Sequence, residues 1–119
     1  MSALEAFQEL WSKVYDPRSG CPDVKVGYVL ETMAAVLVKD MATPANLTER
    51  WVLAWLQLLG RPSCLLDIQL AWERLHSDAR KLGSKSTTVE DDMLEAARAI
   101  RALATAGLIR DSKGEWAPV

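Results

Sequence analysis

Histidine and cysteine are scarce in this chain, and their scarcity disfavours most kinds of catalytic and metal site. The 119 residues include one histidine, His76, and two cysteines, Cys21 and Cys64. Zinc sites and disulfide frameworks need several such residues at short paired spacings, and a catalytic nucleophile needs a base beside it. A glycine-rich phosphate-binding loop is absent as well. We therefore predict a protein of a reducing, intracellular compartment that is not an enzyme, uses no metal or cofactor and has no small-molecule substrate.

The chain also lacks a basic excess and a long apolar run. Its 14 Lys and Arg residues and 16 Asp and Glu residues give a net charge of −2, which disfavours coating of nucleic acid or membranes by bulk electrostatics. The most apolar run, 27–38, is interrupted by Glu31 and Thr32, so we expect no membrane span. The length, with 50% hydrophobic residues, predicts a single domain, 1–119, with one core.

The last third of the chain begins with the signals of a helix. Thr87 and Thr88 each stand three residues before a carboxylate, as in a capping box, so either threonine can begin the helix. Apolar residues then recur at helical spacing: Met93, Leu94, Ala97, Ile100, Leu103 and Ala104. Gly107 predicts the end of this helix because it can adopt a left-handed conformation.

A hairpin is predicted directly after that helix. The runs 108–110 and 115–117 have β-forming residues, and the four residues between them, 111–114, are rich in turn formers. Helix, glycine, strand, turn and strand form the usual ending of a winged helix, in which the hairpin is the wing.

Two amphipathic helices are predicted at the start of the chain. The first runs over 2–15, with Ser2 and Glu5 at capping-box spacing. Two prolines and a glycine break it at 16–22. The second runs over 24–42, and its predicted buried stripe consists of Val26, Val29, Leu30, Met33, Val36, Leu37 and Met41.

A third helix is predicted from the Asn46 cap to the Gly60 stop. Trp51 and Trp55 lie four residues apart on one face, and leucines and a valine cover much of the rest. Such a helix fits the core, and the alternative is an exposed partner-binding face.

A short strand at 63–66 and a fourth helix from Asp67 to Gly83 complete the elements. The resulting order predicts a mainly α fold: a winged helix-turn-helix with two additional N-terminal helices and a small C-terminal β-hairpin wing. Residues 1–45 form the predicted helical extension, and 46–119 form the predicted winged-helix core.

Charges on the last helix argue against reading of DNA bases. The helix before the wing often enters the major groove, where Arg, Lys, Asn or Gln read base edges. Here Glu90, Asp91, Asp92 and Glu95 occupy the first turns and would repel phosphates. We interpret the triplet 90–92 as carboxylates favoured by the helix dipole rather than as a cation site.

Basic residues remain as candidates for contacts with DNA backbone or with a protein partner. They are Arg80, Lys81, Lys85, Arg98, Arg101, Arg110 and Lys113. The alternative is that they are ordinary solvated charges, with Arg98 paired within its helix to Glu95.

The second half of the chain resembles the C-terminal winged-helix domain of origin recognition complex subunit 3. The resemblance rests on 67–68 with Ala71 and Leu75, on 90–95 and 97–103, on 107–110 and on Trp116. It implies assembly with other subunits of a DNA replication initiation complex in the nucleus, with DNA contact shared across that complex. It does not imply ATP hydrolysis by this segment. Residues 1–60 carry no part of it.

The sequence thus favours a non-enzymatic interaction module that docks to protein subunits and contacts duplex DNA, if at all, through the wing. One alternative is a dimeric winged-helix transcriptional regulator, cytoplasmic in a bacterium, whose two leading helices form the dimer interface. Another is a purely helical interaction domain.

Overall fold

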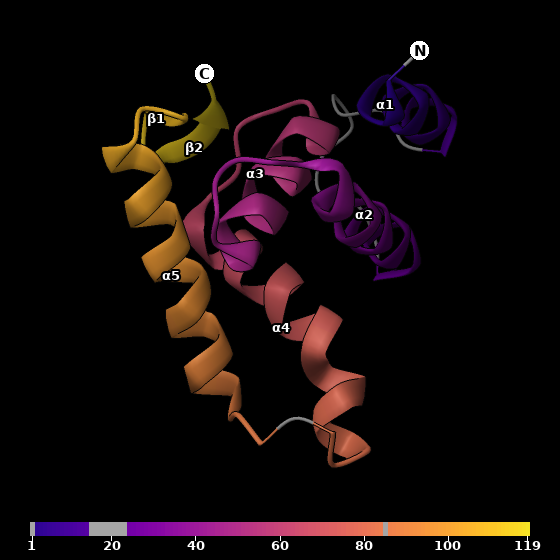
Figure 1. Cartoon of the computed structure of the whole chain (residues 1–119), viewed down its shortest axis with the longest axis vertical. Helices are drawn as coiled ribbons and strands as arrows, with labels where there is room; N and C mark the ends of the chain where they lie inside the picture. The colour runs from indigo at the N-terminus through magenta and orange to yellow at the C-terminus, as the bar shows by residue number, and fades with distance from the viewer. Residues whose placement is uncertain (1, 15–23, 85) are drawn as a thin grey trace.

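The computed structural model describes residues 2–14, 24–84 and 86–119, which form five α-helices and one hairpin (Figure 1). The helices are α1 (Ala3–Val14), α2 (Val24–Leu37), α3 (Leu47–Leu59), α4 (Leu65–Lys81) and α5 (Val89–Thr105). Strands β1 (Ile109–Ser112) and β2 (Glu115–Pro118) follow α5 and pair antiparallel. The predicted mainly helical fold with a C-terminal hairpin is confirmed. Among the residues described, no helix has the length and apolarity needed to cross a membrane.

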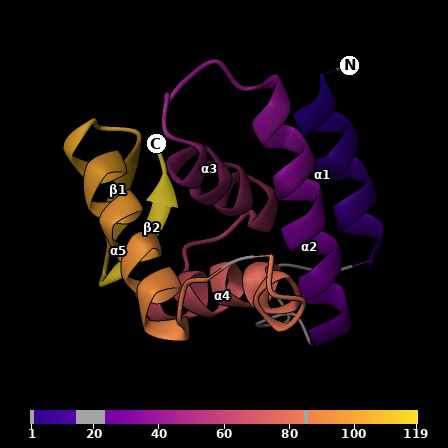
Figure 2. The same cartoon turned by 60° about the horizontal axis from the view of Figure 1, so that its bottom comes forward.

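Helices α1 and α2 lie side by side along one flank of α3 (Figure 2). The Glu5 amide donates to Ser2 Oγ at 3.2 Å, so the predicted cap of α1 is confirmed. Helix α2 ends earlier than predicted, and the chain continues as a short 3₁₀ helix, Val38–Asp40. The predicted break at 16–22 lies outside the described residues.

The buried stripe of α2 is narrower than predicted. Leu30, Met33 and Leu37 are buried, but Val29 and Val36 are each 43% exposed, so their prediction as core residues was wrong. Both valines line an open apolar groove of about 370 Å³ whose opposite wall includes Phe7 of α1. The helical spacing was right, but the neighbouring helices cover only part of that face.

Helix α3 is central and buried on nearly every side. The Glu49 amide donates to Asn46 Oδ1 at 3.1 Å at its start, and Gly60 ends it with a φ of 74°. Both signals had been predicted from the sequence. Nine of its 13 residues are buried, which confirms the core helix and excludes the alternative of an exposed partner-binding face.

Three tryptophans form the centre of the core. The ring of Trp51 stacks on that of Trp55, with centroids 6.3 Å apart, and meets that of Trp72 of α4 at 5.0 Å. Trp51 Nε1 also donates to the backbone oxygen of Glu31 on α2 at 3.2 Å. The hydrophobic cluster around them runs without interruption from Trp11 of α1 to Ile109 of β1.

The strand predicted at 63–66 is reduced to one residue. Ser63 exchanges two backbone hydrogen bonds with Trp116 of β2, at 2.9 and 2.8 Å, and α4 already begins at Leu65. The prediction of a four-residue strand was therefore wrong, because the apolar pair 65–66 opens the helix instead. Even so, the single bridge attaches the start of α4 to the hairpin.

The hairpin turn is tighter than predicted. Ser112 pairs with Glu115, so only Lys113 and Gly114 form the loop, with φ values of 55° and 84°. Two positive φ angles in a two-residue loop match the twist of the flanking strands. The Gly114 amide donates to Asp111 Oδ1 at 2.9 Å. Residues 111 and 112, predicted as turn, therefore belong to β1.

A buried carboxyl group joins α2 to α4. Glu31 is fully buried, and its Oε1 accepts hydrogen bonds from the Arg74 guanidinium at 2.6 and 2.8 Å. Its Oε2 is also buried and has no hydrogen-bond partner among the described residues. Burial raises the pKa of Glu31 from 4.5 to about 7, although Arg74 opposes the rise and Glu73 adds to it.

This raised pKa predicts a pH-dependent stability. The folded chain keeps the Glu31 proton up to about pH 7, whereas the unfolded chain releases it near pH 4.5, so stability falls as pH rises through this window. The free energy of unfolding of Glu31→Gln should not show this fall, because glutamine cannot ionise. Measured relative to wild type, it should therefore be higher at pH 8 than at pH 5 by about 2–3 kcal/mol. Urea unfolding at both pH values measures this difference, and parallel pH profiles of the two proteins would contradict it.

Candidate interaction surface on α5 and the hairpin

The start of α5 is fixed by a capping box. The Asp91 amide donates to Thr88 Oγ1 at 3.1 Å, and the Thr88 amide donates to Asp91 Oδ2 at 3.0 Å. Of the two threonines that the sequence allowed, Thr88 is therefore the cap. These hydrogen bonds, first that of the Thr88 backbone, lower the pKa of Asp91. Asp91 thus has a structural role at the surface.

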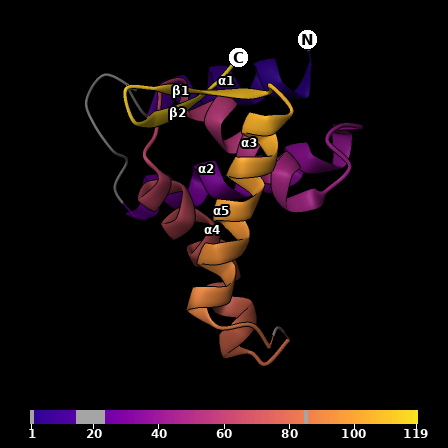
Figure 3. The ribbon, with the colours of Figure 1, turned by 90° about the vertical axis from the view of Figure 1, so that its left-hand side faces the viewer.

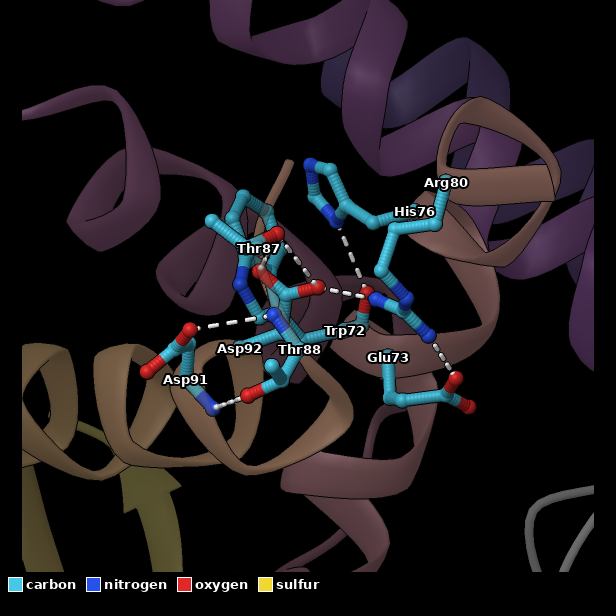
Figure 4. A network of polar contacts seen from close by, with 8 residues as sticks. All are labelled: Trp72, Glu73, His76, Arg80, Thr87, Thr88, Asp91 and Asp92. Atoms are coloured by element: carbon cyan, nitrogen blue, oxygen red, sulfur yellow. Dashed lines mark hydrogen bonds and ion pairs between the residues drawn. The ribbon is translucent and has the colours of Figure 1, made fainter. Parts of the chain in front are cut away.

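Asp92 is different from its acidic neighbours because it is fully buried. Its carboxylate accepts hydrogen bonds from Thr87 Oγ1, at 3.1 and 3.3 Å, and forms an ion pair with Arg80 of α4 (Figure 4). Arg80 also pairs with Glu73 one to two turns earlier in α4. The network ties the end of α4 to the start of α5. Asp92 does lie in the acidic first turn of α5, as the helix-dipole interpretation requires, but the sequence analysis did not predict its burial or its ion pair.

The same network removes Arg80 from the candidate contact residues. Its side chain is only 14% exposed, and both of its terminal nitrogens bind carboxylates within the chain. A sequence signal for this network does exist, since Asp92 lies four, seven and eleven residues before the buried Ala96, Ala99 and Leu103. Asp92 is thus on the buried face of its own helix.

Two further hydrogen bonds hold α5 in place along its length. Thr48 Oγ1 of α3 donates to Glu95 Oε1 at 2.5 Å, and Gln69 Nε2 of α4 donates to the Met93 backbone oxygen at 2.9 Å. Glu95 is therefore engaged with α3. The predicted Glu95 to Arg98 pair is not among the ion pairs of the described residues, so Arg98 is available at the surface.

The remaining face of α5 is exposed from end to end. Glu90, Leu94, Arg98, Arg101 and Thr105 recur at helical spacing and are all exposed, and we call them the outer face of α5. Leu94 is 49% exposed. Figure 3 shows α5 running down the molecule with no other described helix or strand across it. The outer face is acidic at its start, apolar at its middle and basic in its second half.

A mainly apolar groove of about 280 Å³ adjoins the basic half of this face. Its walls come from Ala97, Ile100 and Ala104 of α5, from Leu65 of α4 and from Trp116 of β2, with Arg101 at its side. The Ser63 bridge to Trp116 brings the start of α4 and the hairpin together here. The groove therefore depends on three elements that are distant in sequence.

The predicted basic residues do not form one patch. Lys81 is exposed at the end of α4, at the bottom of Figure 1, and Lys85 lies outside the described residues. Arg110 and Lys113 are exposed on the hairpin, at the opposite end of α5. Arg110 lines a second groove, of about 280 Å³, with Arg61. A single duplex contact that includes both Lys81 and the two basic residues of the hairpin is thus disfavoured.

The imidazole of His76 on α4 lies against the ring of Trp72. His76 is half-buried, its Nδ1 donates to the Trp72 backbone oxygen at 2.9 Å, and the two rings lie 4.0 Å apart (Figure 4). Within the described residues, no group of three or more His, Cys, Asp or Glu side chains is arranged to hold a metal ion. His76 thus packs on Trp72 as a structural residue.

Comparison with protein-family models, with curated proteins and with solved structures gives no match for this chain.

Proposed function

We propose that the chain is a non-enzymatic winged-helix module that docks to protein through α5 rather than reading DNA bases with it. The order α3, Ser63 bridge, α4, α5, β1 and β2 supports the winged-helix assignment. In this assignment α5 is the helix before the wing, and Ser63 stands where a third strand would pair with β2.

The outer face of α5 has the composition of a protein interface, and this observation is the main support for the proposal. The N-terminal turns, which would approach bases in the usual binding mode, expose Glu90 and Asp91. Leu94 is a large apolar side chain in the middle, and the groove beside Arg101 is mainly apolar. Such a surface repels phosphates at one end and offers apolar contacts at the centre, which is typical of a protein interface.

The resemblance of the second half to origin recognition complex subunit 3 extends the proposal. We infer that the module works in a nuclear assembly for DNA replication initiation, where a protein partner occupies α5 and the wing touches DNA backbone. Lys113 at the tip of the hairpin is the residue best placed for such a contact, since it is exposed in the loop.

Fluorescence anisotropy with duplex DNA over a salt series tests the proposal. We expect weak binding without sequence preference that disappears as salt is raised, because only the wing contacts phosphates. Lys113→Glu should weaken that binding further. Lys81→Glu, at the end of α4 and far from the hairpin, is the matched control and should leave the binding unchanged. Tight, sequence-selective binding by the wild-type chain would overturn the docking proposal.

One observation favours a second candidate function, a dimeric winged-helix transcriptional regulator. The open groove of about 370 Å³ on α1 and α2, with Val29 and Val36 exposed, is where the leading helices would form a dimer interface. A regulator of this kind would place its two α5 helices about 34 Å apart, to match successive turns of the major groove. Small-angle scattering of a dimer on duplex DNA would distinguish the two functions.

A further inference from the structure

The charges on the outer face of α5 are not explained by the helix itself. Acidic residues in the first turn satisfy the helix dipole, but the last turn contains no basic residue. Arg98 and Arg101 lie further inside the helix, and no ion pair among the described residues involves either of them. Arg101 beside the apolar groove and Arg98 on the same face of the helix are therefore exposed, and neither has an ion-pair partner among the described residues.

The outer face of α5 matches the same face of a second, antiparallel α5 in charge and in side-chain size. Glu90 and Arg101 lie equally far from the midpoint between residues 95 and 96, and so do Leu94 and Ala97. If a second α5 crosses the first at this midpoint in antiparallel orientation, Glu90 of each copy lies opposite Arg101 of the other. Leu94 of each copy then lies opposite Ala97 of the other, so a large side chain meets a small one.

From this complementarity we propose that the outer face of α5 is an interface with a second copy of this chain, related by a two-fold axis. The inference rests on the proposed function, because it names the protein to which α5 docks. Such an isologous contact is the commonest kind of homo-oligomer interface. Its two Glu90 to Arg101 pairs select the antiparallel orientation, since a parallel pair would place like charges together.

Exposed charge pairs contribute little binding free energy, so a stable dimer also needs an apolar contact, and the groove beside α5 provides one. In the antiparallel pair the first half of one α5 lies over residues 97–104 of the other, where Ala97, Ile100 and Ala104 line the groove. Leu94 of the second copy thereby enters a cavity of about 280 Å³ closed on the far side by Leu65 and Trp116. Arg101 at the side of the groove meets the Glu90 that accompanies this leucine one turn earlier.

Analytical ultracentrifugation of the whole chain, with a charge-exchange pair of variants, tests the interface. A contact of one helix and one groove is small, so we expect a dimer with a dissociation constant of about 10–100 µM. Arg101→Glu places two carboxylates opposite each other, and Glu90→Arg places two guanidinium groups opposite each other. Each variant alone should show a dissociation constant raised by about tenfold or more.

An equimolar mixture of the two variants distinguishes loss of the interface from loss of folding. In a mixed dimer both contacts are again Glu opposite Arg, so the mixture should dimerise as wild type does, which a mere loss of folding could not produce. Leu94→Ala should weaken the dimer, and Leu82→Ala, which truncates a leucine 84% exposed beyond the end of α4, should not.

Three results would overturn the inference: a monomeric wild-type chain at millimolar concentration, a mixture that behaves as two separate variants, or a dimer broken by Val36→Asp but not by Arg101→Glu. The last result would place the interface on α1 and α2. None of them bears on whether α5 avoids DNA, which the duplex titration decides separately.

Discussion

Replacement of Asp92 by alanine should lower the free energy of unfolding by about 3 kcal/mol, because it leaves the buried guanidinium of Arg80 without its closest counter-ion. Thr87 Oγ1 loses its acceptor in the same variant. We expect the lower end of the range for a broken buried pair because Glu73 still binds Arg80. Urea unfolding followed by circular dichroism measures the loss.

A double-mutant cycle separates the ion pair from ordinary packing. Arg80→Met alone leaves a fully buried carboxylate and should destabilise by about 3–5 kcal/mol. The double variant, Arg80→Met with Asp92→Ala, carries neither charge, so its loss should be smaller than the sum of the two single losses by about 1–3 kcal/mol. Glu90→Gln, at an exposed position two residues before Asp92, is the control and should change stability by about 0.5 kcal/mol or less. Additive losses would show that Asp92 and Arg80 do not form the proposed buried pair.

Replacement of Trp51 by alanine should lower the free energy of unfolding by about 3–5 kcal/mol, as for other large buried aromatic side chains. Trp51 is 2% exposed and contacts Trp55 and Trp72. Its loss also removes the hydrogen bond from Nε1 to the Glu31 backbone oxygen, which joins α3 to α2. The same urea experiment measures the effect.

Trp116→Ala is the matched control for this prediction, because its ring is only half-buried at the groove beside the hairpin. It should destabilise less than Trp51→Ala. Equal losses for the two variants would mean that the core is not centred on α3.

Local signals in the sequence predicted the caps of α3 and α5, but not the end of α2 or the start of α4. The caps at Asn46 and Thr88 and the stops at Gly60 and Gly107 act through backbone groups within a few residues, so spacing alone reveals them. The strand at 63–66 failed for a related reason. A run of four apolar and small residues fits a strand and a helix start equally well, and the pairing partner of Ser63 is 53 residues away at Trp116.

The functional surface was harder to predict because it depends on contacts between distant segments. Asp92 lies in the first turn of α5, where the helix dipole favours carboxylates, but its ion pair with Arg80 of α4, twelve residues earlier, cannot be predicted from spacing within α5. The wide separation of Lys81 from Lys113 follows from the antiparallel path of α4 and α5 and is not visible in composition. The periodicity of α5 was only partly informative: Ile100 and Leu103 of its predicted apolar set are buried, but Leu94 is 49% exposed and belongs to the outer face.

The central claim is that the outer face of α5 contacts protein and not DNA, and backbone NMR of the labelled whole chain tests it most directly. The amide signals of Leu94, Ala97 and Arg101 should move as the protein is diluted, because the second copy leaves them, and should not move when duplex DNA is added at constant protein concentration. Signals of α5 that are unchanged by dilution but shift on addition of duplex would contradict the claim.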